Sequence, residues 1–537
     1  MYKNMAYFFA SITLSIMLVL VKLFTISADG SYVEAVQSQS NYTLTLSRTR
    51  GTIYDCNMRP LAGGRALYKA VVLSGETPVA VLEEHLSAEQ FESVKQRLKN
   101  NYPFAITVSD GTLSNYGINV YKTSQRYTSY YPAVHTVGYL DYSGTQGITG
   151  IERAFDQWLS DGSGEYKVTC QVDGLGRVLE GTSPQINDST ENSAQGVVLT
   201  LDADILQIVE SAAQKHLKQG AIVVMEIPSG KLRALVSVPT FSPLDIASAI
   251  DNSNSALVNR CLSQYDVGSV FKLVTAASAL ESGISPSRQY ECTGSLTIGN
   301  NTFTCSGNKA HGVLNMEGGI CYSCNLYFIQ LAQEVGAQRL LATAQFFGFG
   351  ESIVLAPEYE SFSGNLPSFE KLQNPAALAN FSFGQGELLA TPLQIAAMVG
   401  SVASGGKRII PQLVEKTVDR YGNTNETFLT VSDKMIINTT TSQKLCSFMR
   451  AAVLDGTAQP GATEKITSAA KTGTAETGIR VDGAEIVQAW YAGFFPYENP
   501  QYVCVVLAEN GSGGGISAGP IFKEIAEGIS KYMTYKQ

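Results

Sequence analysis

The longest apolar stretch of the chain lies at its N-terminus. Residues 6–27, AYFFASITLSIMLVLVKLFTIS, are apolar apart from Lys22 and a few hydroxyl residues. Because about 20 apolar residues cross one bilayer as a helix, residues 1–28 are predicted to be a cytoplasmic N-terminus and one transmembrane anchor. Lys3 lies before the run, and the positive-inside rule then places everything after the helix outside the cell. A cleaved signal peptide ending at Ala28 is the alternative.

Residues 29–190 are mixed, polar and loop-rich, and we expect them to form a separate non-catalytic pedestal domain. Strand-like alternation occurs at 68–75, and apolar residues recur at helical spacing over 79–100, with acids early and bases late. No metal cluster, phosphate loop or nucleophile motif appears in this part of the sequence. Residues 181–196 are polar and rich in turn formers, which is typical of a linker.

The pattern changes after the linker and predicts an α+β domain over 191–537. A strand and an amphipathic helix at 197–217 are followed by two apolar strands around PSG at 220–239. A second such hairpin lies at 486–510, and a helix at 521–533 follows it. Strands at both ends of a domain around a helical middle indicate one antiparallel sheet assembled from both ends, with helices on both sides.

Charge and cysteine content narrow the functional classes. The chain has 38 basic and 47 acidic residues, which argues against nucleic acid as its main partner. Nine cysteines in an exported chain leave at least one thiol unpaired within the monomer. Cys292 and Cys305 flank two short strand-like runs, so a disulfide across a hairpin is possible. Cys321 and Cys324 have the spacing of a zinc or redox pair, but the other two cysteines are not a C-x-x-C pair, so we interpret the spacing as coincidence and expect no metal.

A serine and a lysine in the segment YDVGSVFKL carry the candidate chemistry. Ser269 follows Gly268 at the start of a predicted helix, and Lys272 is one turn further on, so the two side chains face the same way. A serine hydroxyl needs a base to become a nucleophile, and a buried lysine with a lowered pKa can be that base. A bare S-x-x-K occurs often by chance, so this pair alone decides nothing.

Two further motifs follow the first in order. Ser323 and Asn325 form S-x-N, and "KTG" begins at Lys471 in a strand-like segment. Ser323 can relay a proton between Lys272 and a leaving amine, and Asn325 can hold a substrate amide. Lys471 and Thr472 are predicted to bind a substrate carboxylate. Gly473 is predicted to keep the strand clear, so that the substrate can lie along it as an added strand. The N–H groups of Thr474 and Ser269 can face an oxyanion.

These motifs resemble those of the class B penicillin-binding proteins, and the resemblance extends over nearly the whole chain. The order S-x-x-K, S-x-N, K-T-G is shared with penicillin-binding proteins and class A β-lactamases. RTRGTIYDCNMRPLA at 48–62 is similar to the first pedestal motif of class B enzymes, and 130–140 and 147–164 look like the next two. FSFGQGELLATPLQIA at 381–396 resembles their G-Q-G element. Two departures are Cys56, where the family usually has arginine, and Asp266–Val267 in place of a proline before G-S.

The resemblance implies a monofunctional, membrane-anchored peptidoglycan D,D-transpeptidase with a penicillin-binding/β-lactamase-like catalytic domain outside the cell. Ser269 would be acylated by a D-Ala-D-Ala stem peptide and by β-lactams, and neither a metal nor a nucleotide would be needed. The implied protein partner is a multi-spanning glycan polymerase. Whether the chain serves division, elongation or sporulation stays open.

The sequence argues against other functions that share some of these features. A Ser-His-Asp hydrolase lacks support because there are only four histidines and no G-x-S-x-G, and only His311 lies near the motifs. A β-lactamase-like hydrolase shares the motifs but gains nothing from an anchor and a pedestal. A non-enzymatic scaffold for a glycan polymerase has no need of the complete motif set.

Overall fold

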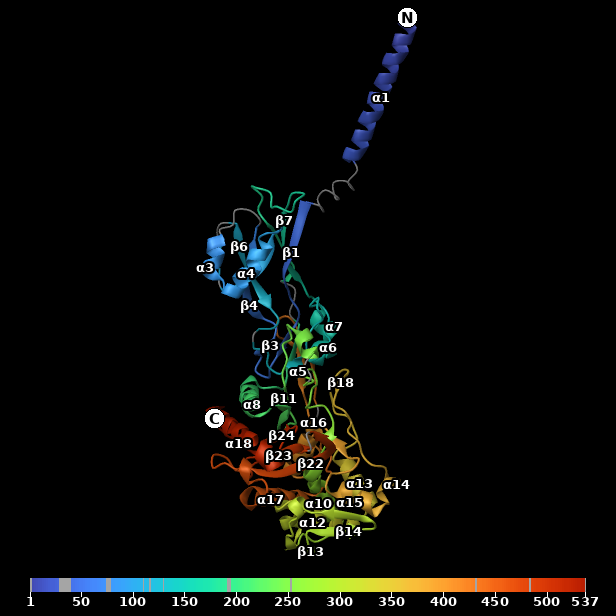
Figure 1. Cartoon of the computed structure of the whole chain (residues 1–537), viewed down its shortest axis with the longest axis vertical. Coiled ribbons are helices and arrows are strands. Elements are labelled where there is room, and N and C mark those ends of the chain that lie inside the picture. Colours follow the sequence, from blue (N-terminus) through green and yellow to red (C-terminus); the bar gives the residue numbers. More distant parts are fainter. Residues whose placement is uncertain are drawn as a thin grey trace. The chain divides into compact units, whose positions relative to one another are not determined.

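The computed structural model describes residues 2–28, 40–73, 79–109, 111–114, 117–128, 130–190, 195–251, 254–429, 432–481 and 484–536 (Figure 1). The chain divides into two compact units. The first consists of Met1–Arg50, Gly64–Arg126 and Gly162–Ser193, and the second of Gly51–Gly63, Tyr127–Asp161 and Ala194–Gln537. Helix α1 (Tyr2–Ala28) is long and apolar enough to cross a membrane, and none of its residues is buried in the protein.

Among the residues that the structure describes after α1, the first unit has two three-stranded antiparallel sheets and two short helices. One sheet has the order β1-β7-β8 and the other β5-β4-β6. Their bounds are β1 Asn41–Arg48, β4 Arg65–Val72, β5 Phe104–Val108, β6 Ile118–Gln125, β7 Glu165–Gln171 and β8 Gln185–Asp188. The predicted helix at 79–100 is two helices, α3 (Val79–His85) and α4 (Ala88–Arg97), because Ser87 begins the second with a capping box. The predicted linker at 181–196 was partly wrong, since it contains β8.

The second unit is built on a five-stranded antiparallel sheet, which confirms the predicted α+β fold. The order is β11 (Leu232–Val238), β10 (Gly220–Glu226), β24 (Tyr502–Ala508), β23 (Ala484–Phe495) and β22 (Ala469–Val481). The two predicted hairpins supply β10–β11 and β23–β24, and β10 pairs with β24 to join them. Strand β22, which carries K-T-G, is therefore the outermost strand at one end.

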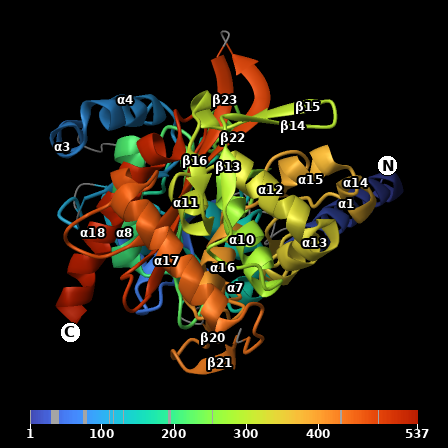
Figure 2. The same ribbon diagram turned by 90° about the horizontal axis from the view of Figure 1, so that it is seen from below.

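Helices cover both faces of this sheet. α8 (Ala203–His216) contacts β11, and α18 (Gly519–Lys536) lies beside α8 and contacts β24 (Figures 1 and 2). α16 (Pro392–Ala403) contacts β10 and β24, whereas α17 (Thr439–Asp455) contacts β22 and α10 (Lys272–Glu281). Every residue of β24 after Tyr502 is buried, as expected for a strand covered on both sides.

A second five-stranded sheet explains why residues 51–63 belong to the second unit rather than to the predicted 29–190 pedestal. Its order is β21-β20-β9-β2-β3, and β2 (Thr52–Tyr54) runs parallel to β9 (Gly196–Leu199). Arg59 adds ion pairs to Asp55 at 2.7 Å and to Asp202 at 3.3 Å. The other strands are β3 Pro60–Ala62, β20 Val414–Val418 and β21 Thr424–Thr427.

The remaining elements lie in the second unit and are short. The helices are α5 Val134–Val137, α6 Gly150–Ala154, α7 Asp156–Ser160, α9 Ile246–Ile250, α11 Met316–Cys321, α12 Asn325–Val335, α13 Ala337–Phe346, α14 Phe369–Leu372 and α15 Pro375–Ser382. The strands are β12 Tyr265–Asp266, β13 Tyr290–Cys292, β14 Ser295–Ile298, β15 Asn301–Thr304, β16 Gly312–Leu314, β17 Val354–Ala356, β18 Tyr359–Glu360 and β19 Leu389–Ala390. Figure 2 shows β14 and β15 as a hairpin that extends from the helices around it.

Candidate active site

The nucleophile turn lies between β12 and α10. Ser269 is in a 3₁₀ turn, Gly268–Phe271, that leads into α10 at Lys272. Gly268 has a φ of +60°, and a Cβ there would meet the Thr474 carbonyl oxygen at 2.8 Å. Its N–H donates to the carbonyl of Gly384 at 2.8 Å, so the G-Q-G element holds the turn from behind. Only glycine fits this position without strain.

Lys272 is fully buried, and four oxygens surround its Nζ. The distances are 2.9 Å to Ser269 Oγ, 2.6 Å to the Ser323 carbonyl, 3.2 Å to Ser323 Oγ and 2.6 Å to Asn325 Oδ1. A neutral amine has two N–H donors, which match the two 2.6 Å acceptors, and its lone pair is then free to take the proton of Ser269.

The loop between α11 and α12 places Ser323 between the two lysines. Its backbone has a φ of +57°, which a non-glycine residue rarely adopts. Lys471 Nζ donates to Ser323 Oγ at 2.8 Å, while Lys272 Nζ lies 3.2 Å from the same oxygen. Ser323 is thus in contact with both amines and can pass a proton between them.

Strand β22 supplies the opposite wall of the site. Lys471 is fully buried and also donates to the Thr472 carbonyl at 2.9 Å. Thr472 Oγ1 donates to Thr457 Oγ1 at 2.7 Å, and Thr474, which is exposed, accepts from the Gly514 N–H at 3.4 Å. Thr457 and Gly514 follow no motif, so sequence reasoning did not find them.

The structure gives a further reason for a glycine at position 473, one that the sequence did not predict. A Cβ at Gly473 would meet Val270 Cγ2 at 2.9 Å and the Val267 carbonyl at 3.1 Å. The missing side chain therefore lets β22 approach the nucleophile turn. Trp490 on β23 fixes the same turn by donating from Nε1 to the Asp266 carbonyl at 2.9 Å.

Burial changes the protonation of both lysines. Loss of solvent lowers the pKa of Lys272 from 10.5 to about 7. Burial, together with the charge of Lys272, lowers the pKa of Lys471 well below its ordinary value. At neutral pH the base next to Ser269 is therefore available as a neutral amine.

Asn325 uses both ends of its amide within the protein. Oδ1 accepts from Lys272 at 2.6 Å, and Nδ2 donates to the Thr304 carbonyl at 3.2 Å. In this arrangement Asn325 orients the base. Its predicted contact with a substrate amide, like the predicted oxyanion contacts of Ser269 and Thr474, stays a prediction.

The cysteines near this loop lie in two different surroundings. Cys292 and Cys305 are free thiols, so the disulfide that the sequence left possible between them is not formed. Together with His311 and Cys324 they form a cluster whose ligand atoms all lie within 4.8 Å of one another. Cys321 points elsewhere, with its thiol 3.6 Å from the Ala451 carbonyl.

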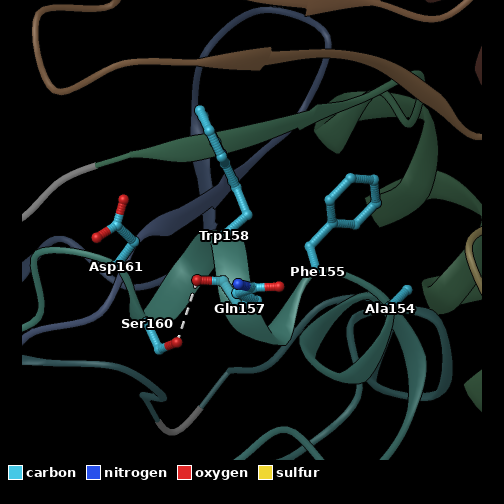
Figure 3. Close-up of a pocket in the computed structure, with 6 residues that line it drawn as sticks. All are labelled: Ala154, Phe155, Gln157, Trp158, Ser160 and Asp161. Carbon is cyan, nitrogen blue, oxygen red and sulfur yellow. Dashed lines mark hydrogen bonds between the residues drawn. The ribbon is translucent and has the colours of Figure 1, made fainter.

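A separate hollow in the second unit lacks such a set of groups. Figure 3 shows its lining of Ala154, Phe155, Gln157, Trp158, Ser160 and Asp161. Ser160 Oγ donates to the Gln157 carbonyl at 3.1 Å, and no lysine or histidine is among these lining residues. None of the predicted site residues lines it.

Comparison with known proteins places this geometry in a family. A family model described as the penicillin binding protein transpeptidase domain matches residues 220–527. The chain belongs to the penicillin-binding protein transpeptidase family. PbpB, a penicillin-binding protein of Mycolicibacterium smegmatis, is 31% identical over 420 residues, which cover 73% of this chain and 62% of that protein. PbpA, a peptidoglycan D,D-transpeptidase of the same organism, is 29% identical over 406 residues, which cover 71% of this chain and 79% of that protein.

A solved structure shares the fold. Penicillin-binding protein 3 from Mycobacterium tuberculosis, complexed with ampicillin, has a TM-score of 0.66 and 23% identity, and the match covers 92% of this chain and 96% of that one. The class B resemblance found in the sequence is confirmed by these relatives. This chain spans less than two thirds of the length of PbpB, 62%.

Proposed function

We propose that this penicillin-binding protein is a peptidoglycan D,D-transpeptidase that works through an acyl-enzyme on Ser269. The observation that carries the proposal is the hydrogen-bonded series from Ser269 through Lys272 and Ser323 to Lys471, in which both amines are fully buried. A serine beside a neutral, desolvated amine is an activated nucleophile. The named D,D-transpeptidase among the relatives supports the same reaction.

In the first step a stem peptide acylates the enzyme. Lys272 Nζ takes the proton from Ser269 Oγ, 2.9 Å away, as Oγ attacks the carbonyl carbon between the two terminal D-Ala residues. The C–N bond then breaks, and the leaving amine receives a proton through Ser323 Oγ, which contacts both lysines. The products are an ester on Ser269 and free D-Ala.

In the second step the same groups act in reverse. The amine of a neighbouring stem peptide attacks the ester carbonyl, and its proton passes through Ser323 toward Lys272. The ester bond breaks, Ser269 regains its proton, and a new peptide bond joins the two stems. The reversal follows from microscopic reversibility, since the group that acts as base in one direction acts as acid in the other.

The outermost strand β22 is the proposed substrate-binding element. A peptide laid along it adds its own backbone hydrogen bonds to the sheet. We propose that the hydroxyls of Thr472 and exposed Thr474, together with the amine of Lys471, receive a C-terminal carboxylate. A β-lactam carries a carboxylate next to its strained amide, and we propose that it acylates Ser269 from the same position.

We further propose that α1 anchors the chain with its N-terminus in the cytoplasm and the second unit outside the cell. A multi-spanning glycan polymerase is the proposed partner. Lys3 ahead of the apolar helix supports the orientation by the positive-inside rule. A protease added to intact cells should then cleave the second unit and leave α1 in the membrane fraction.

Purified chain incubated with a stem peptide ending in D-Ala-D-Ala and an acceptor amine tests the activity. We expect release of D-Ala and a crosslinked product in equal amounts, and neither with Ser269→Ala. The hydrolase alternative predicts rapid turnover of penicillin instead of a lasting adduct. The scaffold alternative predicts that Ser269→Ala still supports crosslinking in cells that depend on this chain.

A further inference from the structure

The acceptor stem peptide must enter where the D-Ala leaves, because both amines exchange a proton with the same hydroxyl, Ser323 Oγ. That oxygen contacts Lys272 and Lys471, and exposed residues beside it control which amines reach the ester. On the basis of the transpeptidase function, we propose that Tyr322, Asp455 and the residues between Asp455 and strand β22 form an acceptor subsite. This subsite takes the acceptor amine as an ammonium ion.

Three exposed side chains connect the catalytic loop to strand β22. Tyr322 precedes Ser323 and is 41% exposed, and its hydroxyl donates to Asp455 Oδ2 at 3.0 Å. Thr457 Oγ1 accepts from Thr472 Oγ1 at 2.7 Å. Asp455 and Thr457 are both exposed, and the two residues of chain from one to the other span at most about 7 Å. The Asp455 carboxylate therefore lies near both walls of the catalytic site.

The loop that carries Asp455 is fixed against the turn that carries Ser323. A Cβ at Gly456 would overlap the carbonyl oxygen of Cys321, so only a glycine allows this close approach. The N–H of Thr457 donates to the same oxygen at 3.1 Å. Because these contacts involve the backbone, the acceptor subsite keeps its place relative to the catalytic serine loop.

The electrostatic field on this side of the catalytic loop is negative. Helix α17 ends at Asp455 and has no basic residue in its last turn, so a carboxylate is added to the negative end of the helix dipole. Among the described residues, no lysine or arginine forms an ion pair with Asp455. Burial raises the pKa of the Cys321 thiol to about 11, and the carboxylates of Asp455 and Glu317 raise it further, each outweighing the opposite effect of Lys471.

A negative subsite suits the acceptor, since a primary amine is an ammonium ion at neutral pH. The Asp455 carboxylate and the hydroxyl oxygens of Tyr322 and Thr457 can accept its N–H groups. The ammonium ion loses one proton to water before it attacks. The neutral amine then forms the C–N bond, and its surplus proton passes through Ser323 to Lys272 as the ester bond breaks. The acceptor subsite therefore selects cationic amines over uncharged nucleophiles.

Two nucleophiles of different charge test the acceptor subsite. The full-length chain in detergent is given a stem peptide ending in D-Ala-D-Ala together with D-alaninamide, an ammonium ion at neutral pH, or hydroxylamine, which is uncharged there. Asp455→Asn should raise the KM for D-alaninamide by about threefold, the size expected for an exposed ion pair, with little change in kcat. The KM for hydroxylamine should not change. Glu426→Gln, which removes an exposed carboxylate from β21, is the control and should alter neither KM.

Added salt tests the wild type without any substitution, so the test remains decisive if Asp455→Asn fails to fold. Salt screens exposed charges and should raise the KM for D-alaninamide but not that for hydroxylamine. An unchanged KM for D-alaninamide in folded Asp455→Asn, equal changes for both nucleophiles, or a wild type insensitive to salt would each overturn the acceptor subsite. A wild type that never releases D-Ala from the stem peptide would refute the proposed function instead.

Discussion

Replacing Lys272 with methionine should separate the catalytic role of this residue from its effect on stability. Methionine fills a similar volume without a charge, so the large cost of burying an ammonium group disappears. Without its base Ser269 should react with penicillin about 10²–10⁴-fold more slowly. The same substitution should also make the protein more stable against unfolding than the wild type. This gain in stability should be larger at neutral pH than at alkaline pH.

The size of this stability effect follows from the pKa of Lys272, which burial lowers from 10.5 to about 7. The folded state favours the neutral amine, whereas the unfolded chain binds a proton at Lys272 below pH 10.5. The resulting penalty, a loss in the free energy of unfolding, is absent above pH 10.5, grows as the pH falls, and is complete below about pH 7. With about 1.4 kcal/mol for each pKa unit, the penalty is about 4 kcal/mol at pH 7 and about 2 kcal/mol at pH 9. Lost hydrogen bonds to Ser323 and Asn325 also change stability, but equally at both pH values, so they cancel in the comparison.

Melting temperatures of wild type and Lys272→Met at pH 7 and pH 9 provide the assay. The difference between the two proteins should shift in favour of the variant by about 2 kcal/mol, or a few degrees, on going from pH 9 to pH 7. The charge of Lys272 also lowers the pKa of Lys471, so its removal stabilises the protonated form of Lys471 and changes stability in the same direction. Exposed Lys218→Met is the control and should show no such shift. An equal difference at both pH values would refute the assignment of a buried amine with a lowered pKa.

Three further substitutions test the geometry around Ser269. Gly268→Ala puts a Cβ 2.8 Å from a carbonyl oxygen at a residue with a φ of +60°. The rate of acylation by penicillin, measured by stopped flow, should therefore fall at least tenfold. Gly283→Ala, whose Cβ would lie in open space, is the control and should leave the rate unchanged. Ser323→Ala breaks the contact between the two lysines and should slow acylation by about 10²-fold; a rate within twofold of the wild type would exclude a proton relay through this hydroxyl. Thr472→Val removes a hydroxyl that we propose to contact the substrate carboxylate, so KM for a D-Ala-D-Ala peptide should rise about tenfold with little change in kcat. A loss in kcat alone would place the carboxylate elsewhere.

The features that the sequence predicts best are those determined by residues close together in the chain. Alternating apolar residues around short turns identify the hairpins of the central sheet, and the spacing of Ser269 and Lys272 places both on one side of a helical turn. The motif order brings Lys471 into the same site. These features depend on residues close together in the chain or on whole motifs, so they survive without knowledge of the tertiary structure.

Tertiary contacts account for what the sequence does not predict. Residues 51–63 join the second unit because β2 pairs with β9 and Arg59 reaches Asp202, contacts that span more than a hundred residues. Spacing alone also cannot tell which thiol of the C-x-x-C pair faces Cys305. Helix α11 ends at Cys321 and turns it toward Ala451, whereas Cys324 caps α12 and faces His311 and its neighbours.

The central claim is that Ser269 becomes covalently acylated with the help of Lys272. Mass spectrometry of the full-length chain after brief exposure to penicillin, followed by proteolysis, tests it most directly. One adduct should be found, on the peptide that contains Ser269, and it should be missing from Ser269→Ala and almost missing from Lys272→Met. An adduct on any other residue, or a Lys272→Met protein labelled at the wild-type rate, would contradict the account.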